Sequence, residues 1–275
     1  MKRFFFLFAL FTATLFSFRP KELNWIAFGD SITYLNDHQN ETGNRVTKGY
    51  MTLVTENMPA IHFVNQGHNG WTAGMIAQKF DTLGIGKADI YSVFLGTNDW
   101  WAGRPLGTLK DYRQNAGNGT IYGSYRIIIN KIKALNPTAH IVLISPMQRT
   151  DFVYINDYKN NAFGSYKSKA NQTLEQVVNA IDSIGTIENI ATIDLFHDKK
   201  LSFDKLVKFK LLKNPTNGTY TKYKYPNYIG LPFNPLTDEY PYPPEAENLT
   251  FDGLHPSDKG YRVIAARLIA IFKNL

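Results

Sequence analysis

The chain has 275 residues, of which 44% are apolar and 19% charged, so it is long enough and apolar enough to form one large folded domain. It contains no cysteine, which excludes disulfides, thiolate metal sites and a cysteine nucleophile. The net charge of +7 comes from one segment, because residues 199–224 hold eight lysines and one acid. No binding motif accompanies these lysines, so we expect no nucleic-acid partner.

The N-terminus has the pattern of a secretory signal. Lys2 and Arg3 precede an apolar run over residues 4–18, which is shorter than the ~20 residues of a typical membrane span. We therefore expect a signal peptide over residues 1–18, an exported (periplasmic or secreted) protein, and no stable membrane insertion after cleavage. A retained N-terminal membrane anchor is the alternative.

From residue 24 onward, short β-branched runs alternate with helical patterns, as is typical of a parallel α/β sheet. Strands are expected at 25–28, 62–65, 90–95, 140–145 and 191–195, and helices near 49–58, 73–83, 122–135, 166–184 and 258–272. No internal repeat or flexible linker interrupts this order. Residues 24–275 are therefore predicted to form a single domain.

A long insertion at about 199–250 departs from this rhythm. Its basic first half has apolar residues between the lysines, which indicates a half-buried element with a solvated face. Its second half is rich in proline and tyrosine, and residues 225–250 carry four acids and no lysine or arginine. Segments of opposite charge can pair, so we interpret the charge as part of the architecture. The role of residues 214–250 stays open between a lid, a fixed wall and a partner surface.

Four motifs lie where predicted strands or helices meet loops. They are Gly-Asp-Ser ending at Ser31, a glycine-rich loop holding Gly67, His68 and Gly70, Gly-Thr-Asn-Asp containing Asn98, and Asp252-Gly-Leu-His255-Pro. Each taken singly also fits an ordinary turn or helix cap. Taken together they suit nucleophilic catalysis, which needs a serine, a histidine base, a carboxylate that orients the base, and N–H donors for an oxyanion.

This set of motifs resembles the SGNH hydrolase superfamily of GDSL-type esterases and lipases, and the resemblance covers nearly the whole chain from residue 24 onward. It implies a flavodoxin-like three-layer α/β/α sandwich with about five parallel strands. It also implies Ser31 as nucleophile, His255 as base and Asp252 as the carboxylate that orients the base. The implied oxyanion donors are the N–H of Ser31, the N–H of Gly70, with Gly67 as the alternative, and the side chain of Asn98.

The substrate is expected to be a small-molecule or polysaccharide ester. Trp100 and Trp101 are candidate substrate-binding residues, because flat aromatic faces suit sugar rings, although core packing is the alternative for such aromatics. His68 is a third candidate, because it lies on the loop of the glycine motif and can line the cleft. We expect removal of acetyl or other short acyl groups from carbohydrate, without a cofactor or a metal. The alternatives are a lipid or aryl-ester hydrolase of lysophospholipase or thioesterase type, and a catalytically silent carbohydrate-binding protein.

Overall fold

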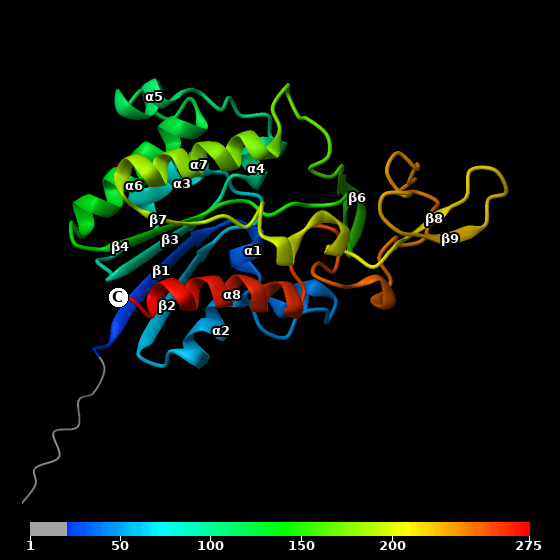
Figure 1. Ribbon diagram of the computed structural model, residues 1–275, viewed down its shortest axis with the longest axis horizontal. Coiled ribbons are helices and arrows are strands. Elements are labelled where there is room, and N and C mark those ends of the chain that lie inside the picture. The colour runs from blue at the N-terminus through cyan, green and yellow to red at the C-terminus, as the bar shows by residue number, and fades with distance from the viewer. Residues whose placement is uncertain (1–20) are drawn as a thin grey trace, which may run out of the picture.

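The computed structural model in Figure 1 describes residues 21–275, so the expected signal peptide at 1–18 lies outside the described residues. The centre is a parallel sheet in the order β2-β1-β3-β4-β7. Its strands are β1 (Leu23–Gly29), β2 (Ile61–Gly67), β3 (Ile90–Phe94), β4 (His140–Ile144) and β7 (Ala191–Ile193). This order is that of flavodoxin-like folds, so the predicted fold class is confirmed.

Helices cover both faces of the sheet. On one face lie α2 (Tyr50–Asn57) and α8 (Asp258–Phe272), which pack on each other. On the other lie α3 (Ala73–Lys79), α6 (Ile121–Leu135) and α7 (Leu174–Glu188), with α5 (Leu109–Arg113) outside α6. The apolar residues of the strands alternate between the two layers, so the molecule has one buried cluster on each side of the sheet.

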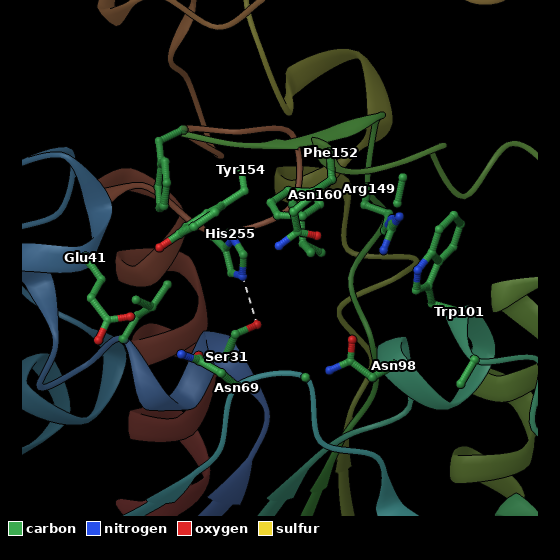
Figure 2. A pocket seen from close by; sticks show the side chains of 16 residues that line it. Ser31, Glu41, Asn69, Asn98, Trp101, Arg149, Phe152, Tyr154, Asn160 and His255 are labelled. Carbon is green, nitrogen blue, oxygen red and sulfur yellow. Dashed lines mark hydrogen bonds between the residues drawn. The ribbon is translucent and has the colours of Figure 1, made fainter. Parts of the chain in front are cut away.

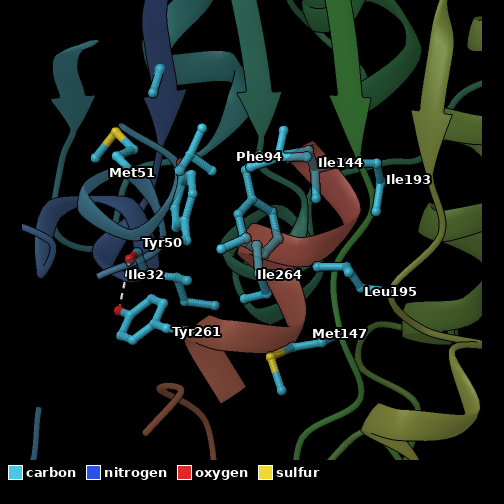
Figure 3. Packing of buried hydrophobic residues seen from close by; sticks show 14 of the residues in the cluster. Ile32, Tyr50, Met51, Phe94, Ile144, Met147, Ile193, Leu195, Tyr261 and Ile264 are labelled. Carbon is cyan, nitrogen blue, oxygen red and sulfur yellow. Dashed lines mark hydrogen bonds between the residues drawn. The ribbon is translucent and has the colours of Figure 1, made fainter. Parts of the chain in front are cut away.

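Figure 3 shows the cluster under α8, where Tyr50, Phe94 and Ile264 pack between the helix and the sheet. The hydroxyl of Tyr261 on α8 donates to the carbonyl oxygen of Ile32 at 2.8 Å. Ile32 lies in α1 (Ser31–Tyr34), the short helix that follows β1. The C-terminal helix therefore helps to hold the residue next to Ser31.

The strand ends are level at the carboxyl edge of the sheet. Gly29 pairs with Gly67 on one side and with Phe94 on the other, and Phe94 pairs with Ile144. The loops that follow these four residues consequently leave the sheet at the same height. In open α/β sheets this edge is where ligands bind.

Two antiparallel hairpins project beyond this edge. One is β5 (Phe152–Tyr154) with β6 (Asp157–Ala162), and the other is β8 (Lys210–Lys213) with β9 (Tyr220–Tyr223). The second belongs to an excursion of the chain over residues 209–245. The excursion closes on itself, because the N–H of Lys208 donates to the carbonyl oxygen of Ala246 at 2.8 Å.

The helix expected at 166–184 was placed too early, because α7 begins at Leu174. Thr173 and Gln176 form a capping box that fixes this start. Upstream, the hydroxyl of Tyr166 binds the carboxylate of Asp151, which keeps this part of the chain in a loop.

The basic half of the insertion is irregular and short-stranded. Lys213 pairs with Asp238 at 2.8 Å, as expected for neighbouring segments of opposite charge. Lys210 is instead buried and binds Asp151 at 2.6 Å, so it supports the loop before β5. Within residues 21–275, no helix is both long and apolar enough to cross a membrane.

Candidate active site

The structure brings Ser31, His255 and Asp252 into one hydrogen-bonded line. Nε2 of His255 lies 2.8 Å from Oγ of Ser31, as the dashed line in Figure 2 marks, and Nδ1 lies 2.6 Å from Oδ2 of Asp252. An ionised carboxylate can only accept, so Nδ1 carries the hydrogen and Nε2 is free to accept the serine proton. Asp252 is fully buried, His255 nearly so, and Ser31 borders a cavity.

A tight turn holds the carboxylate and the imidazole. Oδ1 of Asp252 accepts the backbone N–H groups of Leu254 at 3.0 Å and His255 at 2.7 Å, which fixes the rotamer of the carboxylate. Gly253 has φ +93°, and a Cβ there would collide with the carbonyl oxygen of Asp151. The turn therefore requires glycine between the two functional residues.

The same turn is attached to the chain before and inside β5. The N–H of Thr150 donates to the carbonyl oxygen of Gly253 at 3.0 Å, and the N–H of Val153 donates to the backbone carbonyl oxygen of Asp252 at 3.3 Å. Phe251 stacks on the imidazole of His255, and Phe152 meets it edge-on. These contacts restrict the ring to the plane in which it faces Ser31.

Ser31 is positioned by the turn from β1 into α1. Asp30 caps the helix, because its Oδ1 accepts the N–H of Ile32 at 3.0 Å. Asp30 is buried beneath the site, and this burial raises the pKa of its carboxyl group to about 6. Capping leaves the N–H of Ser31 without a hydrogen-bond partner among residues 21–275, so it is available to a substrate oxygen.

The two candidate glycines of the second motif differ in their surroundings. The N–H of Gly67 donates to the side chain of Asn65 at 2.8 Å, and the residue is packed against α1. Gly70 is exposed, lines the cavity, has φ +74°, and makes no hydrogen bond through its N–H to any described residue. Of these two glycines, Gly70 is the one whose N–H is free for a ligand in the cavity.

Asn98 lies in α4 (Thr97–Trp101), directly after β3, and lines the same cavity. One N–H of its amide donates to the carbonyl oxygen of Trp71 at 3.1 Å. Within residues 21–275, the amide nitrogen makes one further hydrogen bond, a long one of 3.5 Å to Oδ2 of Asp30. The neighbouring Asp99 accepts the N–H of Ala73 at 2.8 Å and pairs with Arg104 at 3.2 Å. Asp99 thereby ties α4 to the start of α3, which follows the Gly70 loop.

The cavity in front of Ser31 has a volume of about 420 Å³. Its walls come from the carboxyl-edge loops and from the β5–β6 hairpin, as Figure 2 shows. The lining residues are Ser31, Leu35, Glu41, Asn69, Gly70, Asn98, Trp101, Ala102, Arg149, Phe152, Tyr154, Asn160, Ala162, Phe251, Leu254 and His255. Half of them carry polar side chains.

Of the three residues expected to bind substrate, only Trp101 lines the cavity. Trp100 is fully buried in the layer under α7, where its Nε1 donates to the carbonyl oxygen of Gln172 at 2.9 Å. His68 stacks on Trp71 at 3.9 Å, and burial lowers its pKa. The expectation for Trp100 and His68 is therefore corrected: both side chains turn into packing contacts, and Asn69 and Gly70 face the cavity instead.

Sequence reasoning missed the wall formed by β5, β6 and the loop before them. Arg149, Phe152, Tyr154 and Asn160 all line the cavity from this region. Apolar and polar residues alternate only weakly in this part of the sequence, because β6 is exposed over most of its length. The short turn at residues 155–156 between two aromatic-containing runs was the only available signal for a hairpin.

Within residues 21–275, no group of three or more histidine, aspartate or glutamate side chains is arranged to hold a metal ion. His197 is bound by Asp194 at 2.7 Å and by Glu175 at 3.0 Å, and these contacts are hydrogen bonds between the side chains themselves. These two carboxylates raise the pKa of His197. This group is far along the chain from the candidate catalytic residues and does not border the cavity.

The fold is a three-layer α/β/α sandwich in which Ser31, at the end of the first strand, meets His255, just before the last helix. Residues 27–213 match the GDSL-like lipase/acylhydrolase family. The chain belongs to this family, and it is an ester hydrolase.

Solved structures agree with this placement. A possible lipase from Chitinophaga pinensis is 62% identical, with a TM-score of 0.91 over 92% of this chain and 98% of that chain. A lipase/acylhydrolase from Enterococcus faecalis is 19% identical, with a TM-score of 0.53 over 92% and 96%. A mutant of an acetyl-xylooligosaccharide esterase from Geobacillus Stearmophilus is also 19% identical, with a TM-score of 0.53 over 91% and 94%. The last two show a shared fold. A comparison with curated proteins found no match.

Proposed function

We propose that the protein is a serine esterase that removes acetyl or other short acyl groups from carbohydrate through Ser31, His255 and Asp252. The observation that carries this proposal is the line of hydrogen bonds of 2.6 Å and 2.8 Å from Asp252 through His255 to Ser31. It ends at a cavity that also exposes N–H donors at Gly70 and Asn98. A nucleophile, a base and an anion site are thus within reach of one bound ester.

In the first half of the reaction, Oγ of Ser31 attacks the acyl carbon while Nε2 of His255 takes the serine proton. The carbonyl oxygen becomes an anion and is bound by the N–H groups of Ser31 and Gly70 and by the amide of Asn98. Asp252 stabilises the imidazolium that forms. His255 then gives the proton to the leaving alcohol, and an acyl group stays on Ser31.

In the second half, a water molecule attacks the acyl group on Ser31 and passes its proton to His255. The tetrahedral anion again lies against the same donors. Collapse of this intermediate returns the proton to Oγ and releases the carboxylic acid. No cofactor or metal enters either half.

The cavity lining supports a polar substrate. Polar groups of Glu41, Asn69, Tyr154 and Asn160 can bind hydroxyls, and Trp101 offers a flat apolar face. The volume of about 420 Å³ lies in the range of small-molecule sites. The fold is shared with an acetyl-xylooligosaccharide esterase, so it can accommodate such a reaction.

The runner-up is a lipid or aryl-ester hydrolase. Leu35, Phe251 and Leu254 form an apolar part of the wall against which an acyl chain could lie. The relative from Chitinophaga pinensis is described as a possible lipase. A series of p-nitrophenyl esters from acetyl to octanoyl separates the two: kcat/KM falls with chain length for the deacetylase and rises for the lipid hydrolase.

The test of the catalytic assignment is Ser31→Ala, with Ser183→Ala on the outer side of α7 as the matched control. We expect the first variant to lose at least about 10⁴-fold in kcat on p-nitrophenyl acetate and the second to keep its activity. Acetate release from acetylated polysaccharides, measured on the same proteins, identifies the alcohol part. A folded Ser31→Ala protein that still turns over at the wild-type rate would refute the proposal.

The proposal includes export, for which the basic start and apolar run of residues 1–18 are the support. Cell fractionation with N-terminal sequencing of the mature protein tests it. A mature protein that begins at residue 1 in the cytoplasm would contradict export.

A further inference from the structure

Arg149 is a buried cation in the wall of the catalytic cavity. It lies in the loop between β4 and β5, it is only 2% exposed, and it borders the same cavity as Ser31 and His255. In Figure 2 it lies beside Trp101 on one side of the cavity, with Glu41 and Tyr154 on the other. It is the one arginine or lysine among the lining residues.

The contacts of Arg149 hold the guanidinium without neutralising it. One of its terminal N–H groups donates to the carbonyl oxygen of Phe163 at 2.8 Å, and Nε has no partner among residues 21–275. The guanidinium lies 5.3 Å from the ring of Trp100 and 5.0 Å from that of Trp101. These aromatic contacts orient the planar group and leave its charge unpaired.

The nearest acid in sequence does not supply the missing partner. Asp151 is bound by Lys210 at 2.6 Å, by the hydroxyl of Tyr166, and by the N–H of Gly164 at 2.8 Å. The carboxylate of Asp252 is used by His255 and by the turn that holds it. Arg149 forms no ion pair with any carboxylate of the described residues, and burial lowers its pKa to about 10.

Two more cations extend this positive side toward solvent. Lys169 lies 4.3 Å from the ring of Trp101, and Lys167 lies 5.7 Å from that of Phe163. Neither forms an ion pair within residues 21–275. Lys169 thus adds a second positive charge beside Trp101, the residue that also contacts Arg149.

A buried guanidinium is unfavourable unless an anion or several acceptors pair with it, and its fork of donors matches a carboxylate in two parallel hydrogen bonds. The catalytic residues do not use Arg149, and one carbonyl oxygen leaves most of its donors free. The donors that stay free at the cavity wall are therefore available to an anionic group of a bound ligand.

We propose that Arg149 binds a carboxylate carried by the ester substrate, so that the enzyme prefers acidic esters to neutral ones of the same shape. The proposal rests on the proposed function for the reaction itself. The carboxylate can belong to the alcohol part, as in an acetylated uronic acid, or to the acyl part, as in a half-ester of a dicarboxylic acid. Arg149 is a specificity-determining residue in either case.

Matched pairs of substrates test the preference. For the alcohol part the pair is p-acetoxybenzoate and p-acetoxybenzamide, and for the acyl part it is mono-p-nitrophenyl adipate and its terminal amide. We expect the wild-type enzyme to favour the acid in one pair by about 10- to 100-fold in kcat/KM, as for a hydrogen-bonded charge pair. Raising NaCl from about 0.05 to 0.5 M should reduce this ratio, because salt screens the exposed lysines.

Variants assign the preference to the residue. Arg149→Met should bring the acid-to-amide ratio close to one, Arg149→Lys should keep part of the preference, and Lys169→Met should reduce it slightly. Arg113→Met, on the exposed side of α5, is the matched control and should leave the ratio unchanged. Circular dichroism melting curves show which variants are folded. If Arg149→Met does not fold, the acid-to-amide ratio of Arg149→Lys provides the test.

Calorimetry on Ser31→Ala makes the test independent of turnover. This variant should bind p-acetoxybenzoate more tightly than p-acetoxybenzamide, and Ser31→Ala combined with Arg149→Lys should bind it more weakly. Equal wild-type rates and equal binding for both members of both pairs would overturn the proposal and leave the esterase intact. A preference that survives in folded Arg149→Met would also overturn it, whereas an active Ser31→Ala protein would refute only the catalytic assignment.

Discussion

Replacing Asp252 with asparagine changes one atom of the site and reverses the direction of one hydrogen bond. Oδ1 of Asp252 accepts two backbone N–H groups, at 3.0 Å and 2.7 Å, so the oxygen of an asparagine must keep that place. Its NH₂ group then points at Nδ1 of His255, which must accept. The proton of the imidazole moves to Nε2, and Ser31 loses its base.

The expected loss in kcat for Asp252→Asn is about 10⁴-fold, or roughly 5 kcal/mol in transition-state stabilisation, by analogy with the same change in serine proteases. Steady-state hydrolysis of p-nitrophenyl acetate measures it, with Asp81→Asn on the surface as control. The fold should persist, because both backbone hydrogen bonds remain. A folded Asp252→Asn enzyme that keeps its kcat within tenfold of wild type would refute the role assigned to the carboxylate.

Three further outcomes are expected. Asn98→Ala should lower kcat by about 10²–10³-fold with little change in melting temperature, since one oxyanion donor is removed; an unchanged kcat would exclude Asn98 from the anion site. Gly70→Ala should reduce kcat by straining a backbone at φ +74°, whereas Gly67→Ala should mainly lower the melting temperature, because its Cβ would collide with α1. Kinetics and melting curves of both variants separate the two effects. A large loss of kcat in Gly67→Ala alone would favour Gly67 as the donor. Asp30→Asn should stabilise the protein at pH 7 by up to roughly 3 kcal/mol, because folding raises the pKa of Asp30 from 3.8 to about 6 and so penalises the ionised form. That gain in the free energy of unfolding should vanish as the pH falls from about 6 to 4, because wild-type Asp30 then takes up its proton. Urea unfolding of both proteins at several pH values measures it. A difference that stays constant across this pH range would contradict the reasoning.

Most of the fold was predictable because apolar periodicity follows from one face of each element being buried. The final helix was expected at 258–272 and is found there, since its stripe of apolar residues packs on α2 and the sheet. The strand ends were predictable for the same reason. Once a parallel sheet is assumed, Ser31, Gly70 and Asn98 must leave it at a common edge, and the structure places all three beside the cavity.

The remainder depends on long-range contacts that no local pattern contains. Trp100 and Trp101 are adjacent and chemically identical, yet one is buried under α7 and the other lines the cavity, because the helical turn points them in different directions. The sequence predicts a solvated Lys210, whereas in the structure its ammonium group binds Asp151, which lies 59 residues away in the chain. Arg149 belongs to no sequence motif, and its place in the cavity wall follows from its position beside the β5–β6 hairpin in the folded chain.

The excursion over residues 209–245 leaves and rejoins the chain at one place, where Lys208 and Ala246 are hydrogen-bonded. Between these two ends, the excursion also contacts the segment to which the turn with Asp252 and His255 is hydrogen-bonded. The hydroxyl of Tyr242 donates to the carbonyl oxygen of Asp151, that of Tyr240 donates to the carbonyl oxygen of Val153 at 3.0 Å, and Lys210 binds the carboxylate of Asp151. A change in the length of the tip between β8 and β9 therefore leaves the imidazole in place, whereas loss of these three side chains would disturb the residues that hold it.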